Sequence, residues 1–330
     1  GLKVLTAGGN PGLKALGRKA GMKGAATAFD LGFLLGPRIN AAGRIGHARL
    51  AFDLLTTDDP ARREALAEKL HEMNAERQAI ERIVQEEAIQ LVEQRGLDQR
   101  AVIVAAGEGW HPGVVGIVAG RLKDRYQRPA IVVGVEAGLA KGSARSISGV
   151  DIGAAIRAAR AAGLLLAGGG HAMAAGLSAD ARRLGDLDAF LEQSLRGDVD
   201  RAIAAQRFEI DALVAPGAVD ARFARLIDAA GPFGPGNPEP VFALASMTVD
   251  RARLVGEAHL ACDLVSATGE SVRAIAFRAE GEKLGELLKS RRRLHLAGRI
   301  KTDAWRGGDA GQFQIIDAAE PVSETSRAAL

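Results

Sequence analysis

The sequence predicts an α/β fold followed by a small β-barrel, and three features carry this prediction. Apolar runs at 101–106 and 130–135 are typical of strands buried in a sheet, and a helical pattern separates them. A long helical pattern without internal Gly or Pro precedes them at 60–94. After residue 206 the pattern changes to short alternating runs, which favour a barrel of the oligonucleotide-binding (OB) kind.

The composition is that of a globular protein with room for two to three domains in its 330 residues. No apolar run reaches the roughly 18–20 residues that span a bilayer. The first residues lack the pattern of a signal peptide, so the expected compartment is the cytoplasm, without a membrane partner. Cys262 is the single cysteine, which excludes an internal disulfide and a cysteine-cluster metal site.

The first part of the chain reads as short helices, one of them at 28–35. The Gly-Pro pair at 36–37 is expected to break this helix and to leave Arg38, Asn40 and Arg44 near a helix start. Arginine matches the geometry of phosphate, and helix N-termini attract anions. The alternative is that Asn40 and Arg44 only fix a buried loop.

The long helical pattern has clear start and stop signals. Asp59 is a good N-cap, Pro60 suits the first helical position, and Gly96 suits the end. At 1.5 Å per residue the helix would be about 50 Å long. We therefore expect a strut between two domains, with a free coiled coil as the alternative.

The central unit combines the two apolar strands with helices expected at 114–126, 151–161 and 184–195. Its most distinctive stretch is 168–176, in which three glycines precede His171. We predict a turn whose glycines, Gly169 and Gly170 among them, leave the backbone free to take positive φ and to lie close against a ligand, with N–H groups that can bind an anion. His171 could donate to a phosphate. The alternative is a tight turn before a buried strand, with His171 a satisfied core histidine.

Two more polar, glycine-flanked stretches are predicted as loops, and loops of α/β domains usually bind ligands. One contains His111 and the other contains Ser143 and Arg145. Together with His171, Ser143 and Arg145 could hold a phosphate through charge-assisted hydrogen bonds. A purely structural role is the alternative for His111. No G-x-S-x-G elbow surrounds Ser143, which disfavours a nucleophilic serine.

The expected barrel carries a basic segment, with seven Lys and Arg residues between 289 and 306 against Asp303 alone. This segment predicts a track for a nucleic-acid backbone, with a solvated strand edge as the alternative. The residues assigned to the track are Arg291, Arg292, Arg293, Arg299 and Lys301. The barrel has few aromatic residues for base stacking: Phe277, Trp305 and Phe313.

No metal site is apparent in the sequence. Hydrolysis of a phosphodiester typically needs a metal to activate water. DHH and H-x-x-x-H spacings are absent, and Asp58-Asp59 is better explained as a helix cap. From the residues alone, we predict an anion-binding α/β module joined to a β-barrel.

Five motifs extend this prediction: GPRINAAGR at 36–44, WHPGVVGI at 110–117, KGSARS at 141–146, GGHAMAAG at 169–176 and GPFG at 231–234. In this order and spacing, over about residues 1–320, they resemble the RecJ family. These are bacterial single-strand-specific 5′→3′ DNA exonucleases of the DHH phosphoesterase superfamily.

The resemblance implies a domain order and a cofactor. The domains would be the C-terminal part of a DHH domain (1–57), a connecting helix (58–96), a DHHA1 domain (97–197), an OB-fold (205–320) and a tail (321–330). The cofactor would be Mn²⁺ or Mg²⁺, with its ligands in the part of the DHH domain that precedes this sequence. The implied partners are single-stranded DNA and a single-strand-binding protein or a helicase.

The resemblance also implies residue roles. His171 would be catalytic and contact the scissile phosphate, while Ser143 and Arg145 would bind the 5′-terminal phosphate. Asn40 and Arg44 would line the DHH side of the cleft. The predicted phosphate-binding set is Arg38, Asn40, Arg44, His111, Ser143, Arg145, Gly169 and Gly170.

Because the metal-binding part is missing, we expect the parent protein to be the exonuclease and this chain alone to bind single-stranded DNA without cleaving it. One alternative is a DHH-family phosphodiesterase for nano-RNA or cyclic dinucleotides. Such enzymes generally lack the OB-fold and the long helix, which disfavours them. The other alternative is a non-catalytic nucleic-acid-binding module.

Overall fold

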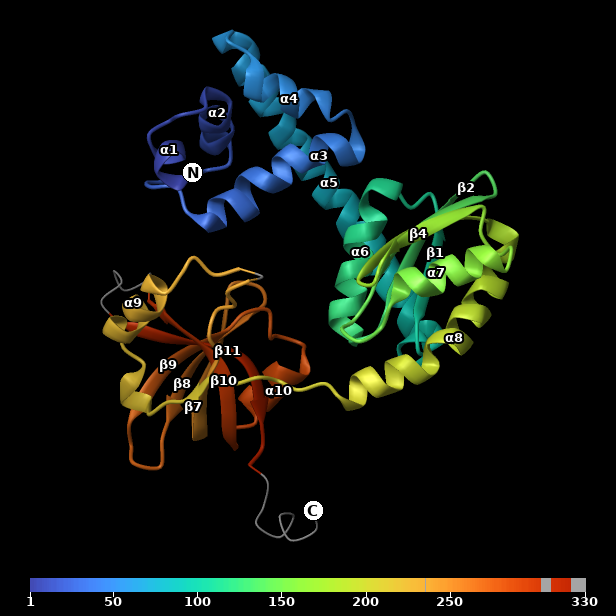
Figure 1. Cartoon of the computed structure of the whole chain (residues 1–330). Helices are drawn as coiled ribbons and strands as arrows, with labels where there is room; N and C mark the ends of the chain where they lie inside the picture. Colours follow the sequence, from blue (N-terminus) through green and yellow to red (C-terminus); the bar gives the residue numbers. More distant parts are fainter. Residues whose placement is uncertain (235, 304–309, 322–330) are drawn as a thin grey trace. The chain divides into compact units, whose positions relative to one another are not determined.

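The computed structural model of the chain describes residues 1–234, 236–303 and 310–321. The chain divides into two compact units, Gly1–Gln206 and Arg207–Leu330, and each is described by itself (Figure 1). Among the described helices, none has the length and apolar character needed to cross a membrane.

The first unit begins with helices that pack against the first half of α5. Their shared core contains the fully buried side chains Leu16, Leu54 and Leu70. The helices are α1 (Leu2–Thr6), α2 (Pro11–Lys19), the π-helical turn η1 (Asp30–Leu35), α3 (Gly36–Ile45), α4 (Arg49–Thr56) and α5 (Pro60–Arg95).

The predicted break at Gly36-Pro37 is wrong, because η1 leads directly into α3. The amide of Gly36 donates to the carbonyl of Leu31, five residues earlier. This wider turn accommodates Pro37, which lacks an N–H and crowds the preceding turn of a regular α-helix. As a result, Arg44 lies in the last turn of α3 and not near a helix start.

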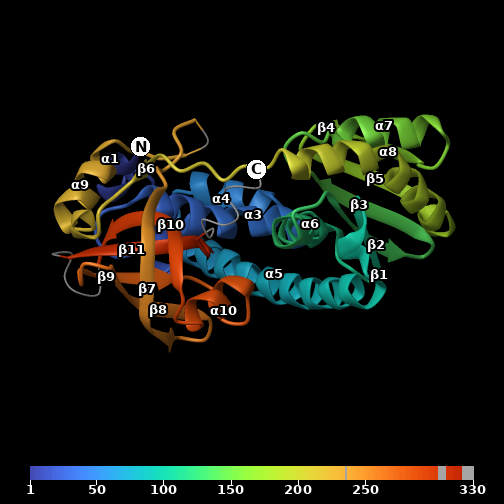
Figure 2. The same cartoon turned by 90° about the horizontal axis from the view of Figure 1, so that it is seen from below.

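The predicted long helix is confirmed as α5. The Asp59 side chain caps it by accepting from the Ala61 amide at 2.9 Å, and Gly96 ends it with φ 61°. The second half of α5 packs on the sheet through a core that includes Val84, Ala88 and Val92. Figure 2 shows α5 running from the N-terminal helices to the edge of the sheet at β1.

A five-stranded sheet forms the rest of the first unit, with the order β1-β2-β3-β5-β4. β1 and β2 are parallel and the other pairs are antiparallel. The strands are β1 (Ile103–Glu108), β2 (Ala130–Glu136), β3 (Leu139–Arg145), β4 (Ala167–His171) and β5 (Ala174–Asp180).

Helices cover both faces of this sheet (Figure 2). α5 and α6 (Pro112–Tyr126) pack on one face, and α7 (Ile152–Ala161) and α8 (Leu184–Ala204) pack on the other. α8 continues beyond the predicted end at 195, because Val199 extends its buried stripe.

The predicted turn at 168–176 is confined to residues 172–173, because 168–171 belong to β4 and 174–176 to β5. The predicted loop at 141–146 is wrong, because 141–145 belong to β3. Gly168, Gly169 and Gly170 do not have positive φ. At two of these positions, neighbouring atoms lie too close to leave room for a side chain. A Cβ on Gly170 would lie 2.3 Å from the Ala174 carbonyl oxygen, and one on Gly168 would lie 2.9 Å from Ile156 Cγ2.

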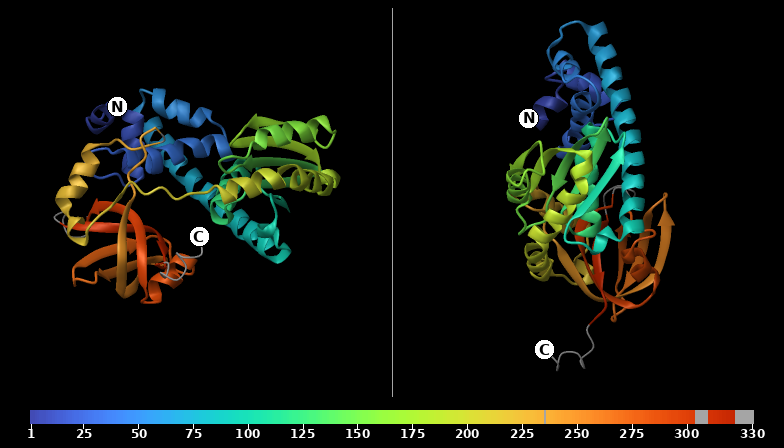
Figure 3. Two further views of the ribbon diagram at one scale, coloured as in Figure 1. Left: turned by 60° about the horizontal axis from the view of Figure 1, so that its bottom comes forward. Right: turned by 90° about the vertical axis from the view of Figure 1, so that its right-hand side faces the viewer.

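In the second unit, β7–β11 close into a barrel through the pairing of β10 with β7. The elements are β6 (Ala212–Leu213), α9 (Ala221–Ala229), β7 (Phe242–Val255), β8 (His259–Val265), β9 (Ser271–Ala276), α10 (Lys283–Lys289), β10 (Arg293–Thr302) and β11 (Gly311–Ala319) (Figure 3).

Two predictions for the barrel need correction. Residues 207–210 do not form a strand, since pairing with the β7 side begins at Asp211, whose amide donates to the Val241 carbonyl at 2.8 Å. Phe313 is fully buried in the barrel core and cannot stack on a base. Phe277 is 52% exposed, and Trp305 lies outside the described residues.

Candidate functional site

The α6 side of the sheet carries the predicted polar residues. Ala140 and Ala144 of β3 belong to the core on the α7–α8 side. Successive side chains of a strand point to opposite faces, so Ser143 and Arg145 face the α6 side. The strand register continues these positions into two rows: Ser143–Gly176–Gly169 and Arg145–Ala174–His171.

β5 and β4, which follow β3 in the sheet, form an open floor of small residues. A Cβ on Gly169 would meet nothing within 4 Å, and one on Gly176 would meet only the Gly142 carbonyl oxygen at 4.0 Å. His171 is exposed at the end of β4, so the alternative of a buried core histidine is wrong. Its row places it two strand spacings from Arg145, about 10 Å.

The Arg145 guanidinium is held in place by its own strand. Nη1 donates to Ser143 Oγ at 2.9 Å and to the Ala144 carbonyl at 2.8 Å. Burial lowers the pKa of Arg145, and the positive charge of Arg44 lowers it further. Neither arginine forms an ion pair with a carboxylate in the described parts of the chain. Two neighbouring cations without a counter-ion favour the binding of an anion between them.

Backbone contact between α3 and α6 brings Arg44 to this place. Arg44 Nη1 donates to the Gly113 carbonyl at 3.2 Å. A Cβ on Gly113 would lie only 2.0 Å from the Arg44 carbonyl oxygen, which explains the glycine after Pro112. His111 caps α6, because its Nδ1 accepts from the Gly113 amide at 3.0 Å.

The start of α7 fixes the β4–β5 hairpin that carries His171. The Ile152 amide donates to the Ala172 carbonyl at 3.1 Å, and Arg157 Nη1 donates to the Gly170 carbonyl at 3.0 Å. A Cβ on Gly153 would lie 2.7 Å from the His171 carbonyl oxygen. Sequence reasoning missed Gly153 and Arg157, because nothing in their local pattern marks contact with a hairpin.

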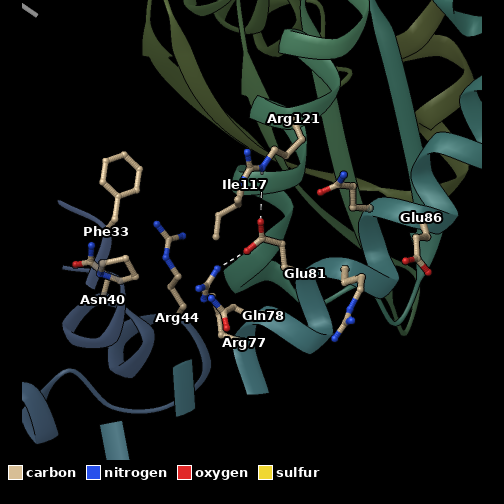
Figure 4. Close-up of a pocket in the computed structure, with 12 residues that line it drawn as sticks. Phe33, Asn40, Arg44, Arg77, Gln78, Glu81, Glu86, Ile117 and Arg121 are labelled. Atoms are coloured by element: carbon tan, nitrogen blue, oxygen red, sulfur yellow. Dashed lines mark hydrogen bonds and ion pairs between the residues drawn. The ribbon is translucent and has the colours of Figure 1, made fainter. Parts of the chain in front are cut away.

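The other predicted residues of α3, Arg38 and Asn40, make different contacts. Arg38 Nη1 donates to the Leu34 carbonyl at 2.8 Å and its Nε donates to His71 Nδ1 at 3.2 Å, which joins α3 to α5. Burial lowers the pKa of Arg38. Asn40 lines a cavity of about 450 Å³ between α3, α5 and α6, and Arg44 lines the same cavity (Figure 4).

Comparison with known proteins covers nearly the whole chain. Residues 99–197 match the DHHA1 domain, and residues 210–317 match the RecJ OB domain. The chain is 35% identical over 328 residues to the single-stranded-DNA-specific exonuclease RecJ of Bacillus subtilis, covering 97% of this chain and 40% of that protein. For RecJ of Thermus thermophilus the identity is 34% over 323 residues, covering 97% and 44%.

The chain carries the DHHA1 and OB domains of the RecJ family.

A solved RecJ structure has the same fold. The crystal structure of T. thermophilus RecJ in complex with Mg²⁺ matches 98% of this chain and 48% of that chain, with a TM-score of 0.79 and 32% sequence identity. This chain thus spans less than half the length of these RecJ proteins.

The described residues do not fit the metal ions of these RecJ structures, which contain Mg²⁺ or Mn²⁺. Within the described ranges, no three His, Cys, Asp or Glu side chains gather as metal ligands. No reaction step through a metal held by these residues can therefore be derived.

In the RecJ OB domain, three cations of the predicted DNA track have acidic partners. Arg292 pairs with Glu320, and Arg299 and Lys301 both pair with Glu239. Lys301 also contacts Asp228 at 3.2 Å. A phosphate at these positions would have to compete with carboxylates. Arg293 is exposed at the start of β10, and Arg291 is exposed in the turn before it.

Proposed function

We propose that this chain binds the 5′-terminal phosphate of single-stranded DNA, as part of a RecJ-type exonuclease that hydrolyses phosphodiesters in the 5′→3′ direction. The observation that carries this proposal is the pair Arg44 and Arg145, without a carboxylate partner in the described chain, beside Ser143 and an open glycine floor. The sequence identity to RecJ proteins supports the same function.

Each of these side chains has a role in the proposed complex. Arg44 and Arg145 donate to different oxygens of the 5′-phosphate. The Ser143 oxygen accepts from Arg145, so its hydroxyl proton remains free to donate to the phosphate. The glycine floor lets the strand lie close to the sheet. His171, at the far end of the Arg145 row, contacts the scissile phosphate.

The metal-binding residues of the proposed exonuclease lie outside this chain. Bound Mn²⁺ or Mg²⁺ would activate water and offset the charge that develops on the phosphate. We expect its ligands in a preceding part of the parent protein. The residues of this chain bind and orient the strand, and the OB domain binds its continuation. A single-strand-binding protein or a helicase remains a predicted partner.

The test uses the purified 330-residue chain with labelled single-stranded DNA and Mn²⁺ or Mg²⁺. We expect binding without release of nucleotides. The affinity should fall steeply with salt, because a protein that contacts several phosphates displaces counterions. Metal-dependent nucleotide release by the pure chain would contradict the proposal. Salt-independent binding of DNA, with tight binding of a cyclic dinucleotide, would favour the small-nucleotide alternative.

A further inference from the structure

The cavity between α3, α5 and α6 adjoins the proposed phosphate site through Arg44, which lines it (Figure 4). Its volume of about 450 Å³ falls within the range of small-ligand pockets. Ser143, Arg145 and His171 are not among its lining residues. Arg44 is therefore the link between this cavity and the proposed phosphate site.

The cavity and His171 lie in opposite directions from Arg145 along the sheet. Arg145 is on β3, and His171 is two strands away on β4, at one edge. α5, which forms one wall of the cavity, packs next to β1 at the other edge (Figure 2). In the proposed complex the strand continues from Arg145 to His171 in its 3′ direction. A group attached to the other side of the 5′-phosphate would therefore point to the cavity.

The charged lining of the cavity contains more arginine than glutamate. Its charged residues are Arg44, Arg77, Arg82, Arg121, Glu81 and Glu86. Glu81 is buried and pairs with Arg77, so its negative charge is already balanced within the protein. The remaining excess of positive charge favours an anionic ligand.

The floor of the cavity is a buried polar cluster on α5. Arg77 is 8% exposed and donates through Nη2 to Asn74 Oδ1 at 2.9 Å. Its Nε is buried and has no hydrogen-bond partner in the described chain. A buried donor without a partner is costly, and an oxygen atom of a ligand in the cavity would provide the partner.

Two arginines at the sides of the cavity can bind such a ligand. Arg121 Nε lies 3.8 Å from Glu81 Oε1, beyond hydrogen-bond distance, and Glu81 already pairs with Arg77 (Figure 4). Arg82 is exposed on α5, and no ion pair is seen for it among the described residues. A phosphate group can therefore engage either arginine without breaking a close ion pair. The side-chain amides of Asn40 and Gln78 provide further donors in the lining.

We propose that this cavity receives the outer phosphates of a strand that ends in a 5′-triphosphate. This inference rests on the proposed function, because the α-phosphate must occupy the Arg44–Arg145 site. Arg82 and Arg121 bind the β- and γ-phosphates, and Arg77 orients the site from the floor. The 5′ side of the α-phosphate carries no nucleotide, so further phosphates attached to it can enter the cavity while the strand itself continues to His171.

The test compares three single-stranded oligonucleotides of one sequence, which end in a 5′-hydroxyl, a 5′-monophosphate or a 5′-triphosphate. Anisotropy of a 3′ label measures their affinities for the 330-residue chain. The unaltered chain should bind the triphosphate strand about tenfold more tightly than the monophosphate strand, which corresponds to about 1.4 kcal/mol. Arg121→Ala should remove most of this gain and leave the affinity for the monophosphate strand within about twofold.

Arg160→Ala is the matched control and should retain the gain, since Arg160 is exposed on α7 and does not line the cavity. Equal or weaker binding of the triphosphate strand than of the monophosphate strand would overturn the proposed role of the cavity. A gain that persists in Arg121→Ala, or that Arg160→Ala loses to the same extent, would also overturn it. The proposed function is tested separately, because it fails only if the unaltered chain binds the monophosphate and hydroxyl strands equally.

Discussion

Gly116 is a glycine in the interior of α6 whose missing side chain leaves room for Ser143 and Arg145 of the proposed phosphate site. A Cβ there would lie 3.0 Å from Ser143 Oγ and 3.1 Å from Arg145 Nη2. Glycine inside a helix costs about 1 kcal/mol relative to alanine, so its presence here calls for a reason. Clearance for these two side chains provides that reason.

Gly116→Ala should therefore weaken the preference for 5′-phosphorylated over 5′-hydroxyl DNA. The added methyl group pushes Ser143 and Arg145 out of place, and we expect a loss of preference of about fivefold, roughly 1 kcal/mol. Thermal stability should change little, because the gain in helix propensity offsets the crowding. Anisotropy with the two oligonucleotides and a melting curve measure both effects.

Gly120→Ala on the same helix is the control, since a Cβ on Gly120 meets nothing within 4 Å. It should stabilise the chain by about 1 kcal/mol without changing the 5′-phosphate preference. An unchanged preference in Gly116→Ala, or the same loss in Gly120→Ala, would contradict this role of Gly116.

At the scale of residues, the polar groups of the site could be predicted from the sequence, but the positions where a side chain would not fit could not. Ser143, Arg145 and His171 were predicted as one group, and the register places them on one face of the sheet. The functions of Gly116 and Gly153 depend on how α6 and α7 pack on the sheet. A local sequence pattern does not encode the distance between a helix and the sheet on which it packs, so the roles of these two glycines could not be predicted.

At the scale of elements, glycine-rich stretches were predicted as turns although they form strands. Gly168 and Gly170 are required by close packing in β4, and Gly169 faces open space. Sequence alone does not distinguish a glycine needed for positive φ from one needed for a close approach. The long helix α5 was predictable because its caps are local signals at Asp59 and Gly96.

The OB domain shows a similar limit for charged residues. Sequence revealed the cluster of cations around β10 but not the carboxylates that pair with Arg299 and Lys301. By contrast, Arg253 on β7 and Arg273 on β9 are exposed, and no ion pair is seen for them in the described chain. They line a cavity of about 370 Å³ on the barrel.

We predict that the double change Arg253→Ala and Arg273→Ala weakens binding of single-stranded DNA more than Arg299→Ala and Lys301→Ala do together. Each phosphate contact contributes about 0.7 to the slope of log affinity against log salt, so the slope should fall by about 1.4. Filter binding over a salt series measures it. A larger fall for the β10 pair would instead support the predicted track on β10.

At the scale of the whole molecule, five short motifs predicted a RecJ-like chain, and the matches to the DHHA1 and RecJ OB domains confirm it. Among the described residues, no cluster of His, Cys, Asp and Glu side chains could hold a metal ion. The proposed function therefore depends on binding of the 5′ end of the strand, for which the residues of this chain need no metal.

The most direct measurement compares the affinities for 5′-phosphorylated and 5′-hydroxyl single strands in the unaltered chain and in Arg145→Ala. Charge-assisted hydrogen bonds contribute about 1.5–3 kcal/mol, so the unaltered chain should prefer the phosphorylated strand by about tenfold or more. Arg145→Ala should bring the two affinities close together, while Arg160→Ala should preserve the preference. Equal losses for both strands in Arg145→Ala would contradict the assignment of Arg145 to the 5′-phosphate.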